Sequence, residues 1–215
     1  MAAINTNLRE AARHGNEFLL KELLRKPSCN VLSKDAHGQT ALMWAALHGH
    51  EACVKILLPV SNVLAANEKG QLALMQAAVH GHVDCVRILL PVSNALAKDA
   101  DGLTALMYAA CNGHKGCIRI LLPESDGLEK NSSGMTALMW AAISGSMDCV
   151  RLLLPVSDVL AKNKHGATAS TWAHCRGYEG LTQFIEAYAL SQNEQAVIDV
   201  AASSGAPRNR AAPRV

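Results

Sequence analysis

The sequence predicts an all-α solenoid of stacked helix-turn-helix units, and three features of its repeat lead to that prediction. Two glycine columns recur with a spacing of 32 residues along the 215-residue chain. Each unit holds two short apolar segments of helix-forming residues, separated by a glycine and ended by turn residues. The first unit is more polar than the rest, as expected for the capping repeat of a stack. Self-similarity at such a period is typical of stacked arrays.

The spacing also predicts where the units begin and end. The opening glycines are Gly38, Gly70, Gly102, Gly134 and Gly166, and the second glycine column is Gly49, Gly81, Gly113, Gly145 and Gly177. Equal spacing leaves no room for inserted loops. The predicted units are an N-terminal capping repeat at 1–34, four full repeats at 35–66, 67–98, 99–130 and 131–162, a degenerate C-terminal capping repeat at 163–190, and a partly disordered helix and tail at 191–215.

One unit, residues 35–66, illustrates the expected local structure. Thr40 is a candidate N-cap for a first helix that continues until Gly49. A second helix covers 50–58 and ends at Pro59, because proline cannot continue the helical hydrogen-bond ladder. Helices of about nine residues are too short to be stable alone in water, so the units must be stabilised by stacking.

The faces of the two helices predict how the stack curves. At 100° per residue, Ala45 and Ala46 lie on one face of the first helix and Trp44 lies on the opposite face. The second helix places Val54 and Leu57 on a face of large aliphatic residues. Small residues allow closer approach, so the first helices should line the concave side.

The repeated pattern G-x-T-A-L-M-x-A-A-x-x-G-H-x-x-C-V-+-x-L-L resembles the ankyrin repeat, which reads G-x-T-P-L-H-x-A-A-x-x-G-H followed by V-x-x-L-L. The resemblance covers 35–162 in four full units, with degraded units on either side. Ala41 and Met43 replace the family proline and histidine, Leu72 replaces a threonine, and a turn shorter by one residue accounts for the period. The family histidine ties neighbouring loops together by hydrogen bonds, so the resemblance implies less rigid loops here.

The resemblance implies a protein-recognition scaffold that uses the turn tips and the concave face of the first helices. We therefore expect a scaffold or adaptor that binds another protein in this groove. The alternative is a regulator or inhibitor that uses the same groove on a partner enzyme.

The residues predicted to contact the partner form three columns. The first, opposite the packed face, holds all three tryptophans: Trp44, Gln76, Tyr108, Trp140 and Trp172. The others are the groove-side residues His48, His80 and Asn112 and the turn tips His37, Lys69, Asp101 and Ser133. Aromatic residues make up 4% of the chain, and Trp and Tyr dominate interface hot spots, so one aromatic column suggests binding. The alternative is that the rings fill gaps beside the alanines of a core poor in aromatics.

The cysteines suggest the main alternative to protein binding, which is metal binding or redox chemistry. Cys53, Cys85, Cys117 and Cys149 recur at the same period, and helices about 8–10 Å apart hold equivalent residues too far apart for disulfides. We expect this column to pack as small hydrophobes. A cluster of Cys111, His114 and Cys117 lacks a fourth ligand at zinc-site spacing, so no metal and no cofactor are expected. The paired histidines at His48/His50 and His80/His82 are predicted to cap helices.

Composition excludes several other classes. A net charge of +2 does not favour nucleic acid, and no apolar run reaches the roughly 20 residues that span a membrane. No catalytic or phosphate-binding motif is present, so we expect a non-enzymatic monomer. Seven cysteines without a signal segment favour the cytoplasm, with the nucleus as alternative. The basic ladder Lys55, Arg87, Arg119 and Arg151 should be a solvated face, with an acidic partner as the alternative.

Overall fold

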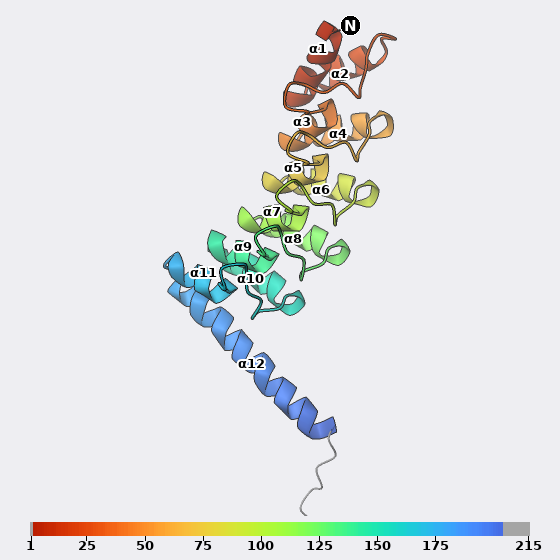
Figure 1. The fold of residues 1–215 in the computed structure, drawn as a ribbon. Coiled ribbons are helices and arrows are strands. Elements are labelled where there is room, and N and C mark those ends of the chain that lie inside the picture. Colours follow the sequence, from red (N-terminus) through yellow and green to blue (C-terminus); the bar gives the residue numbers. More distant parts are fainter. Residues whose placement is uncertain (1, 204–215) are drawn as a thin grey trace, which may run out of the picture.

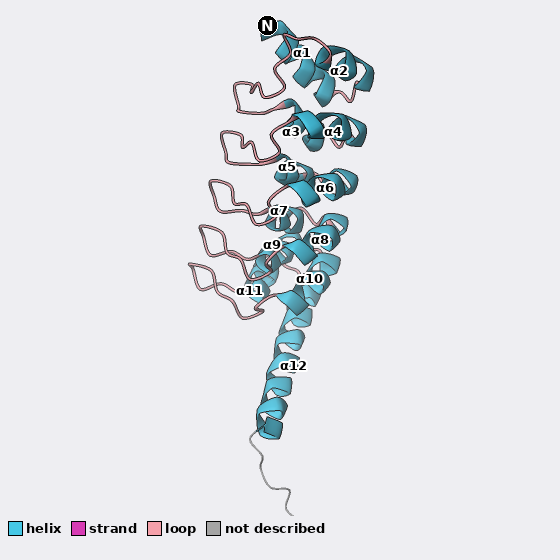
Figure 2. Cartoon of the chain, turned by 90° about the vertical axis from the view of Figure 1, so that its right-hand side faces the viewer, coloured by secondary structure: helices cyan, strands magenta, loops and turns pink. Residues whose placement is uncertain are grey.

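The computed structural model describes the backbone of residues 2–203 and the side chains of residues 3–193. Within that range the chain forms stacked helix pairs, and no strand is present (Figures 1 and 2). The pairs are α1 (Ala2–Arg13) with α2 (Glu17–Leu24), α3 (Ala41–Leu47) with α4 (Glu51–Leu57), α5 (Ala73–Val79) with α6 (Val83–Leu89), α7 (Ala105–Cys111) with α8 (Lys115–Leu121), α9 (Ala137–Ser144) with α10 (Met147–Leu153), and α11 (Ala169–Cys175) with α12 (Glu179–Ser203). The predicted all-α solenoid is confirmed.

The prolines do not stop the second helices abruptly. In the four central units a single 3-10 turn that contains the proline follows the α-helix: η1 (Leu58–Val60), η2 (Leu90–Val92), η3 (Leu122–Glu124) and η4 (Leu154–Val156). Proline lacks an N–H, which ends the α-helical ladder, but its fixed φ suits the first turn of a helix. The α-helix therefore ends before Pro59 as predicted, and the chain continues for one tighter turn.

Threonine side chains cap the first helices. The Thr40 hydroxyl accepts a hydrogen bond from the backbone N–H of Met43 at 3.3 Å, and Thr104 and Thr136 cap α7 and α9 at the same distance. Each cap satisfies one of the N–H groups that a helix start leaves without a partner. Leu72 stands at this position in α5 and makes no side-chain cap.

The first helices pack more closely along the stack than the second helices do. Ala45 and Ala46 are completely buried between neighbouring first helices, and Met43, which replaces the family histidine, is 1% exposed. The second helices bury larger side chains, among them Val54 and Leu57. Closer spacing on one side curves the array toward the first helices, as Figure 1 shows, so the predicted concave side is confirmed.

The loops between units are tied together without the family histidine. In the first loop, Asp35 Oδ1 accepts hydrogen bonds from the backbone N–H groups of His37 and Gln39, both at 2.9 Å. The His37 carbonyl then accepts the N–H of Glu68 in the next loop at 3.2 Å. Equivalent bonds join Lys69 to Ala100, Asp101 to Ser132, and Ser133 to Lys164. The loops form a continuous row (Figure 2), in which backbone hydrogen bonds join neighbouring loops although the family histidine is absent. The expectation of less rigid loops stays a prediction.

Histidines connect the units on the opposite side of the helix pairs. His50 and His82 occupy N-cap positions but make no side-chain cap. Their Nε2 atoms instead bond to carbonyls of the preceding unit, His50 to Arg13 at 2.9 Å and His82 to Leu47 at 3.0 Å. The prediction of capping is therefore wrong, since these rings bridge neighbouring units.

The C-terminal end differs from its prediction. A closing helix ending near residue 190 and a separate helix after it were expected, but α12 is a single helix from Glu179 to Ser203. Its first turns pack on α11, and the rest extends beyond the stack (Figure 1). Residues 204–215 of the helix and tail predicted at 191–215 lie outside the described residues.

Candidate functional site

The predicted aromatic column lies on the first helices, α3 to α11, and faces away from the buried alanines. Trp44, Tyr108, Trp140 and Trp172 are half-buried, so each ring keeps some contact with solvent. Gln76 differs because only 5% of its surface is exposed. The column is therefore not one uniform binding stripe, and hydrogen bonding separates its members further.

Trp44 is held in place from several sides. Its indole Nε1 donates to Asp35 Oδ2 at 2.9 Å. The Arg13 guanidinium lies 5.1 Å from the centre of the indole, and the His48 ring stacks on it at 5.7 Å. With its donor satisfied and its face covered by a cation and an imidazole, this tryptophan is built into the protein.

Gln76 and Tyr108 belong to one hydrogen-bond network that crosses two units. The Tyr108 hydroxyl donates to Asp99 Oδ2 at 2.5 Å and accepts from Gln71 Nε2 at 2.7 Å. Gln71 Oε1 in turn accepts from Gln76 Nε2 at 2.9 Å. Burial, followed by the bond to Asp99, raises the pKa of Tyr108, so the hydroxyl remains protonated. These contacts explain why a glutamine interrupts the aromatic column.

Trp140 and Trp172 lack such partners. The indole Nε1 atoms of both are buried and make no hydrogen bond. The residue equivalent to Asp35 is Asn131 for Trp140, and its Oδ1 already accepts from Ser133 and Met135 N–H at 3.0 and 2.9 Å. The remaining polar atom of Asn131 is an amide nitrogen, which is itself a donor and cannot accept from the indole.

Asn163 reproduces this arrangement in the next unit. Its Oδ1 accepts from the N–H groups of His165 and Ala167, both at 2.9 Å, and its Nδ2 donates to the Met135 sulfur at 3.2 Å. No acceptor is left for Trp172. Both C-terminal indoles are therefore held by packing alone, in contrast to Trp44.

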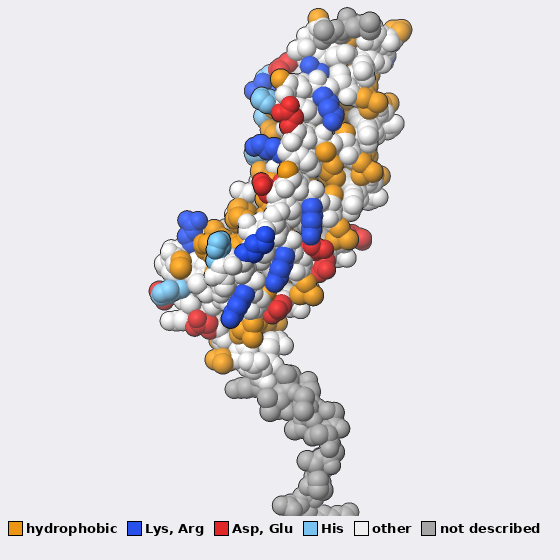
Figure 3. All heavy atoms as spheres, in the orientation of Figure 1, with side chains coloured by type: hydrophobic (Ala, Val, Ile, Leu, Met, Phe, Trp, Pro, Cys, Tyr) orange, Lys and Arg blue, Asp and Glu red, His pale blue; other side chains and the backbone are white. Residues whose placement is uncertain are grey.

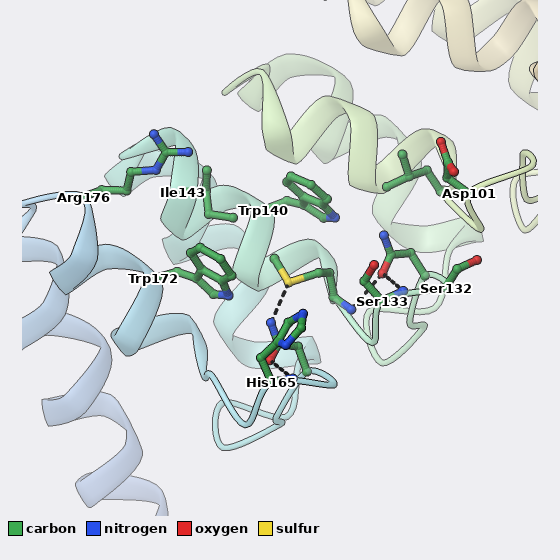
Figure 4. Close-up of a pocket in the computed structure, with 12 residues that line it drawn as sticks. Asp101, Ser132, Ser133, Trp140, Ile143, His165, Trp172 and Arg176 are labelled. Carbon is green, nitrogen blue, oxygen red and sulfur yellow. Dashed lines mark hydrogen bonds between the residues drawn. The ribbon is translucent and has the colours of Figure 1, made fainter.

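A cavity of about 470 Å³ opens where these two tryptophans lie. Figure 4 shows their indoles on the neighbouring helices α9 and α11, with Ile143 and Arg176 at one end and Asp101 at the other. Leu103 and Met135 add apolar surface, and Ser132, Ser133 and His165 add polar groups from the loops. The volume lies within the range of ligand-binding pockets, and the mixture of apolar walls with a few polar groups is typical of them.

The predicted turn tips His37, Lys69, Asp101 and Ser133 are exposed on the row of loops. Their carbonyls are used in the loop-to-loop bonds, which leaves their side chains free to differ in charge on a fixed backbone. Of these four, Asp101 and Ser133 line the cavity.

The groove-side residues His48, His80 and Asn112 are also exposed, at the C-terminal ends of α3, α5 and α7. Burial first, and then the nearby His50 and Arg13, lower the pKa of His48. Burial and the neighbouring His82 lower that of His80 in the same way. Both imidazoles are therefore mainly neutral at pH 7 and become charged only in acid.

Sequence reasoning missed several residues of the cavity. Arg176 follows His48, His80 and Asn112 at the same period, and His165 continues the column of turn tips. Both could have been found by extending the columns into the degenerate last unit. The column that holds Asp at 35 and 99 but Asn at 67, 131 and 163 was also visible, and it decides which ring lacks an acceptor.

Two exposed columns outside the concave face were also missed. Lys34, Lys98 and Lys130 lie on the loop side, where basic side chains recur in Figure 3, and each ammonium bonds to a carbonyl of the next loop. Two residues before the lysine positions, five equivalent leucines are between 49% and 59% exposed, namely Leu32, Leu64, Leu96, Leu128 and Leu160. The lysines contribute to stacking, whereas the leucines have no such contact to explain them.

The basic ladder Lys55, Arg87, Arg119 and Arg151 on the second helices is exposed. Lys55 pairs with Glu51 of its own helix. Asp148, three residues before Arg151 on the same helix, pairs with Lys115 of the preceding unit at 2.8 Å. Arg151 instead lies over the Phe184 ring of α12, 5.2 Å from its centre. Of the ladder residues, Arg151 therefore contributes to a contact between units.

The cysteine column packs as predicted. Cys53, Cys85, Cys117 and Cys149 are buried with free thiols, Cys111 is half-buried, and Cys175 is exposed. Among the described residues, no three His, Cys, Asp or Glu side chains are grouped closely enough to hold a metal ion. In the same part of the chain, no helix combines the length and hydropathy needed to cross a membrane.

Comparison with known proteins defines the family. The model of the ankyrin repeat family matches residues 8–97, 91–163 and 124–198, so the chain belongs to the ankyrin-repeat family. Ankyrin repeat domain-containing protein 29 of Danio rerio and its Homo sapiens counterpart are each 50% identical to this chain over 48 residues. That segment is 22% of this chain and 16% of each of those proteins.

Two solved structures extend the likeness to most of the chain. One belongs to the complex of the Bd0816 predatory endopeptidase of Bdellovibrio bacteriovorus with the immunity protein Bd3460. It superposes with a TM-score of 0.75 at 30% identity, over 84% of this chain and 96% of that one. The other is the ankyrin repeat domain of Bcl-3, a member of the IkappaB protein family, with a TM-score of 0.74 at 25% identity and 85% of both chains covered.

Proposed function

We propose that this protein is a binding module that holds a partner protein on its concave face and loop tips, as a scaffold or adaptor. The observation that carries the proposal is the cavity between α9 and α11, where two half-buried indoles lie beside exposed loop side chains. Half-buried tryptophans beside polar loops have the composition of an interface hot spot. The hydrogen bonds between neighbouring loops support it further, because a preorganised surface loses less entropy on binding.

The structure leads us to revise the predicted site. We propose Trp140 and Trp172 as the principal contacts, with Asp101 and Ser133 beside them. His48, His80, Asn112, His37 and Lys69 remain proposed contacts for a longer partner that follows the concave face. Trp44 and Tyr108 are proposed to support the fold, because their polar atoms are already bonded within the protein. Gln76 is withdrawn, because it is buried.

The alternative function is regulation or inhibition of a partner enzyme through the same face. It is favoured by one observation, the likeness to a chain from a complex of an endopeptidase with an immunity protein. We place the protein in a reducing compartment, the cytoplasm or nucleus, because all seven of its cysteines are free. We further propose a monomer without cofactor or nucleic-acid ligand.

Affinity capture with the full chain tests the binding function. Partners recovered by the wild type are remeasured with the Trp140→Ala/Trp172→Ala variant, and with Arg87→Ala on the second-helix face as matched control. Loss of both indoles should weaken binding by at least ~2 kcal/mol, as truncation of hot spots does. Unchanged affinity in a double variant that melts normally would contradict the proposed site. Loss of a recovered enzyme's activity on stoichiometric titration would favour the regulator.

A further inference from the structure

The cavity between α9 and α11 has a chemistry of its own, which narrows the kind of partner it can take. Its apolar walls are formed by the indoles of Trp140 and Trp172 with Ile143, Leu103 and Met135 (Figure 4). An apolar side chain that enters the cavity therefore loses contact with water on several sides, which is favourable. A cavity of about 470 Å³ has room for one large side chain and a short stretch of main chain, but not for a folded element.

The polar groups at the two ends of the cavity carry opposite charges. Arg176 stands at the end formed by α11, is exposed, and has no ion pair or hydrogen bond from its guanidinium among the described residues. Asp101 stands at the opposite end, on a loop tip. Arg176 is the one Lys or Arg among the lining residues, and a guanidinium binds carboxylates in a planar, two-pronged geometry.

The two indole N–H groups do not select the partner. Both are buried without an acceptor, whereas the equivalent N–H of Trp44 is satisfied by a carboxylate. Because the two nitrogens are buried, a partner contacts the exposed parts of the rings and not their N–H groups. The polar part of the partner is therefore selected by the charged groups at the two ends of the cavity.

We infer that this cavity receives a short acidic peptide segment of the partner protein. An aromatic or long aliphatic side chain lies between the two indoles, and the carboxylate of a neighbouring Asp or Glu pairs with Arg176. The N–H groups of the segment face the Asp101 carboxylate at the other end of the cavity. This inference rests on the proposed function and specifies its partner.

Selection from a random 12-residue peptide library displayed on phage, with the full chain as bait, tests the inference without a known partner. Wild-type protein should enrich peptides that combine an aromatic or long aliphatic residue with an adjacent Asp or Glu. Arg176→Glu should select basic residues at the acidic position. Arg87→Glu, an equal charge reversal on the exposed second-helix face, should leave the consensus unchanged.

Affinities of one enriched peptide give the quantitative check. Binding should fall at least tenfold with Trp140→Ala or Arg176→Glu, and by a similar factor when the acidic residue of the peptide becomes its amide. Trp140→Phe keeps an aromatic wall and provides a second reading if the alanine variant melts early. Its affinity should then lie between those of the wild type and Arg176→Glu.

The outcomes separate this inference from the proposed function. Peptides that bind without an acidic residue, or that tolerate Arg176→Glu but lose affinity with Lys69→Glu or His80→Ala, would overturn the acidic subsite and leave the binding module intact. Enrichment of no peptide together with the capture of no partner would overturn both. A basic consensus for the wild type would assign the recognition to Asp101 and also overturn the inference.

Discussion

The contrast between Trp44 and Trp140 leads to a paired experiment on one hydrogen bond. Asp35→Asn keeps the Oδ1 that accepts from His37 and Gln39 but replaces the Oδ2 that accepts the Trp44 indole by an NH₂ donor. A hydrogen bond to a charged acceptor contributes about 1.5–3 kcal/mol, and its loss leaves a half-buried donor unsatisfied. We expect the variant to lose about 2 kcal/mol, which lowers the Tm of a chain this size by roughly 4–8 °C.

The assay is thermal unfolding followed by circular dichroism, arranged as a double-mutant cycle with Trp44→Phe. Because Phe has no N–H, Asp35→Asn should cost much less in the Phe background than in the wild type. Equal losses in both backgrounds would refute the reasoning, since the effect would then come from the loop and not from the indole.

The stability of the protein at low pH tests the Trp44–Asp35 hydrogen bond independently. Burial alone would raise the pKa of Asp35, but hydrogen bonds from Gln39, Trp44 and His37 outweigh it and hold the pKa below its ordinary value. A carboxyl group with a depressed pKa stabilises the folded state above its unfolded pKa, and that contribution is lost as the pH falls through the folded value. Asp35→Asn should therefore flatten the loss of stability below about pH 4.

The reverse change, Asn131→Asp, should supply the acceptor that Trp140 lacks. We expect a gain of about 1 kcal/mol, smaller than the loss at Asp35 because the Asp101 carboxylate lines the same cavity. The added negative charge should at the same time weaken the binding of acidic peptides. A variant that is more stable but binds less tightly would show that the orphan indole is retained at the expense of stability.

Other positions offer simpler tests. Gly49 and Gly177 have similar positive φ angles of 73° and 78°, but a Cβ at Gly49 would lie 2.4 Å from the His82 ring, whereas at Gly177 no atom lies within 4 Å. Gly49→Ala should thus lower the Tm clearly more than Gly177→Ala, and equal losses would mean that backbone strain alone matters. Native protein should react with a thiol reagent first at Cys175, which is exposed, and last at Cys117, whose burial raises its pKa to about 11. Mass spectrometry of partly modified protein gives the order, and early modification of Cys117 would contradict the packing.

How far the sequence determined this protein can be judged from single residues. The spacing of 32 and the alternation of small and large side chains were sufficient to predict the helix pairs, the Thr40 cap, the buried Cys53 and the side on which Trp44 lies. These features depend on contacts within one unit and with a neighbouring unit of similar sequence. A repeating sequence pattern is therefore sufficient to predict them. The same periodicity could not show that α12 is continuous, because the repeat ends there.

The tertiary structure decided which members of the aromatic column remain available to a partner. Gln71 reaches Tyr108, 37 residues further along the chain, and thereby closes the middle of the column, while Arg13 covers Trp44. A prediction from the repeat pattern alone treats Trp44 and Trp140 as equivalent, because it assigns the same environment to equivalent residues of every unit. Hydrogen-bond satisfaction depends instead on the particular side chains that neighbouring units bring within 3 Å, and those differ from unit to unit. The candidate site therefore became one cavity at the C-terminal end of the array.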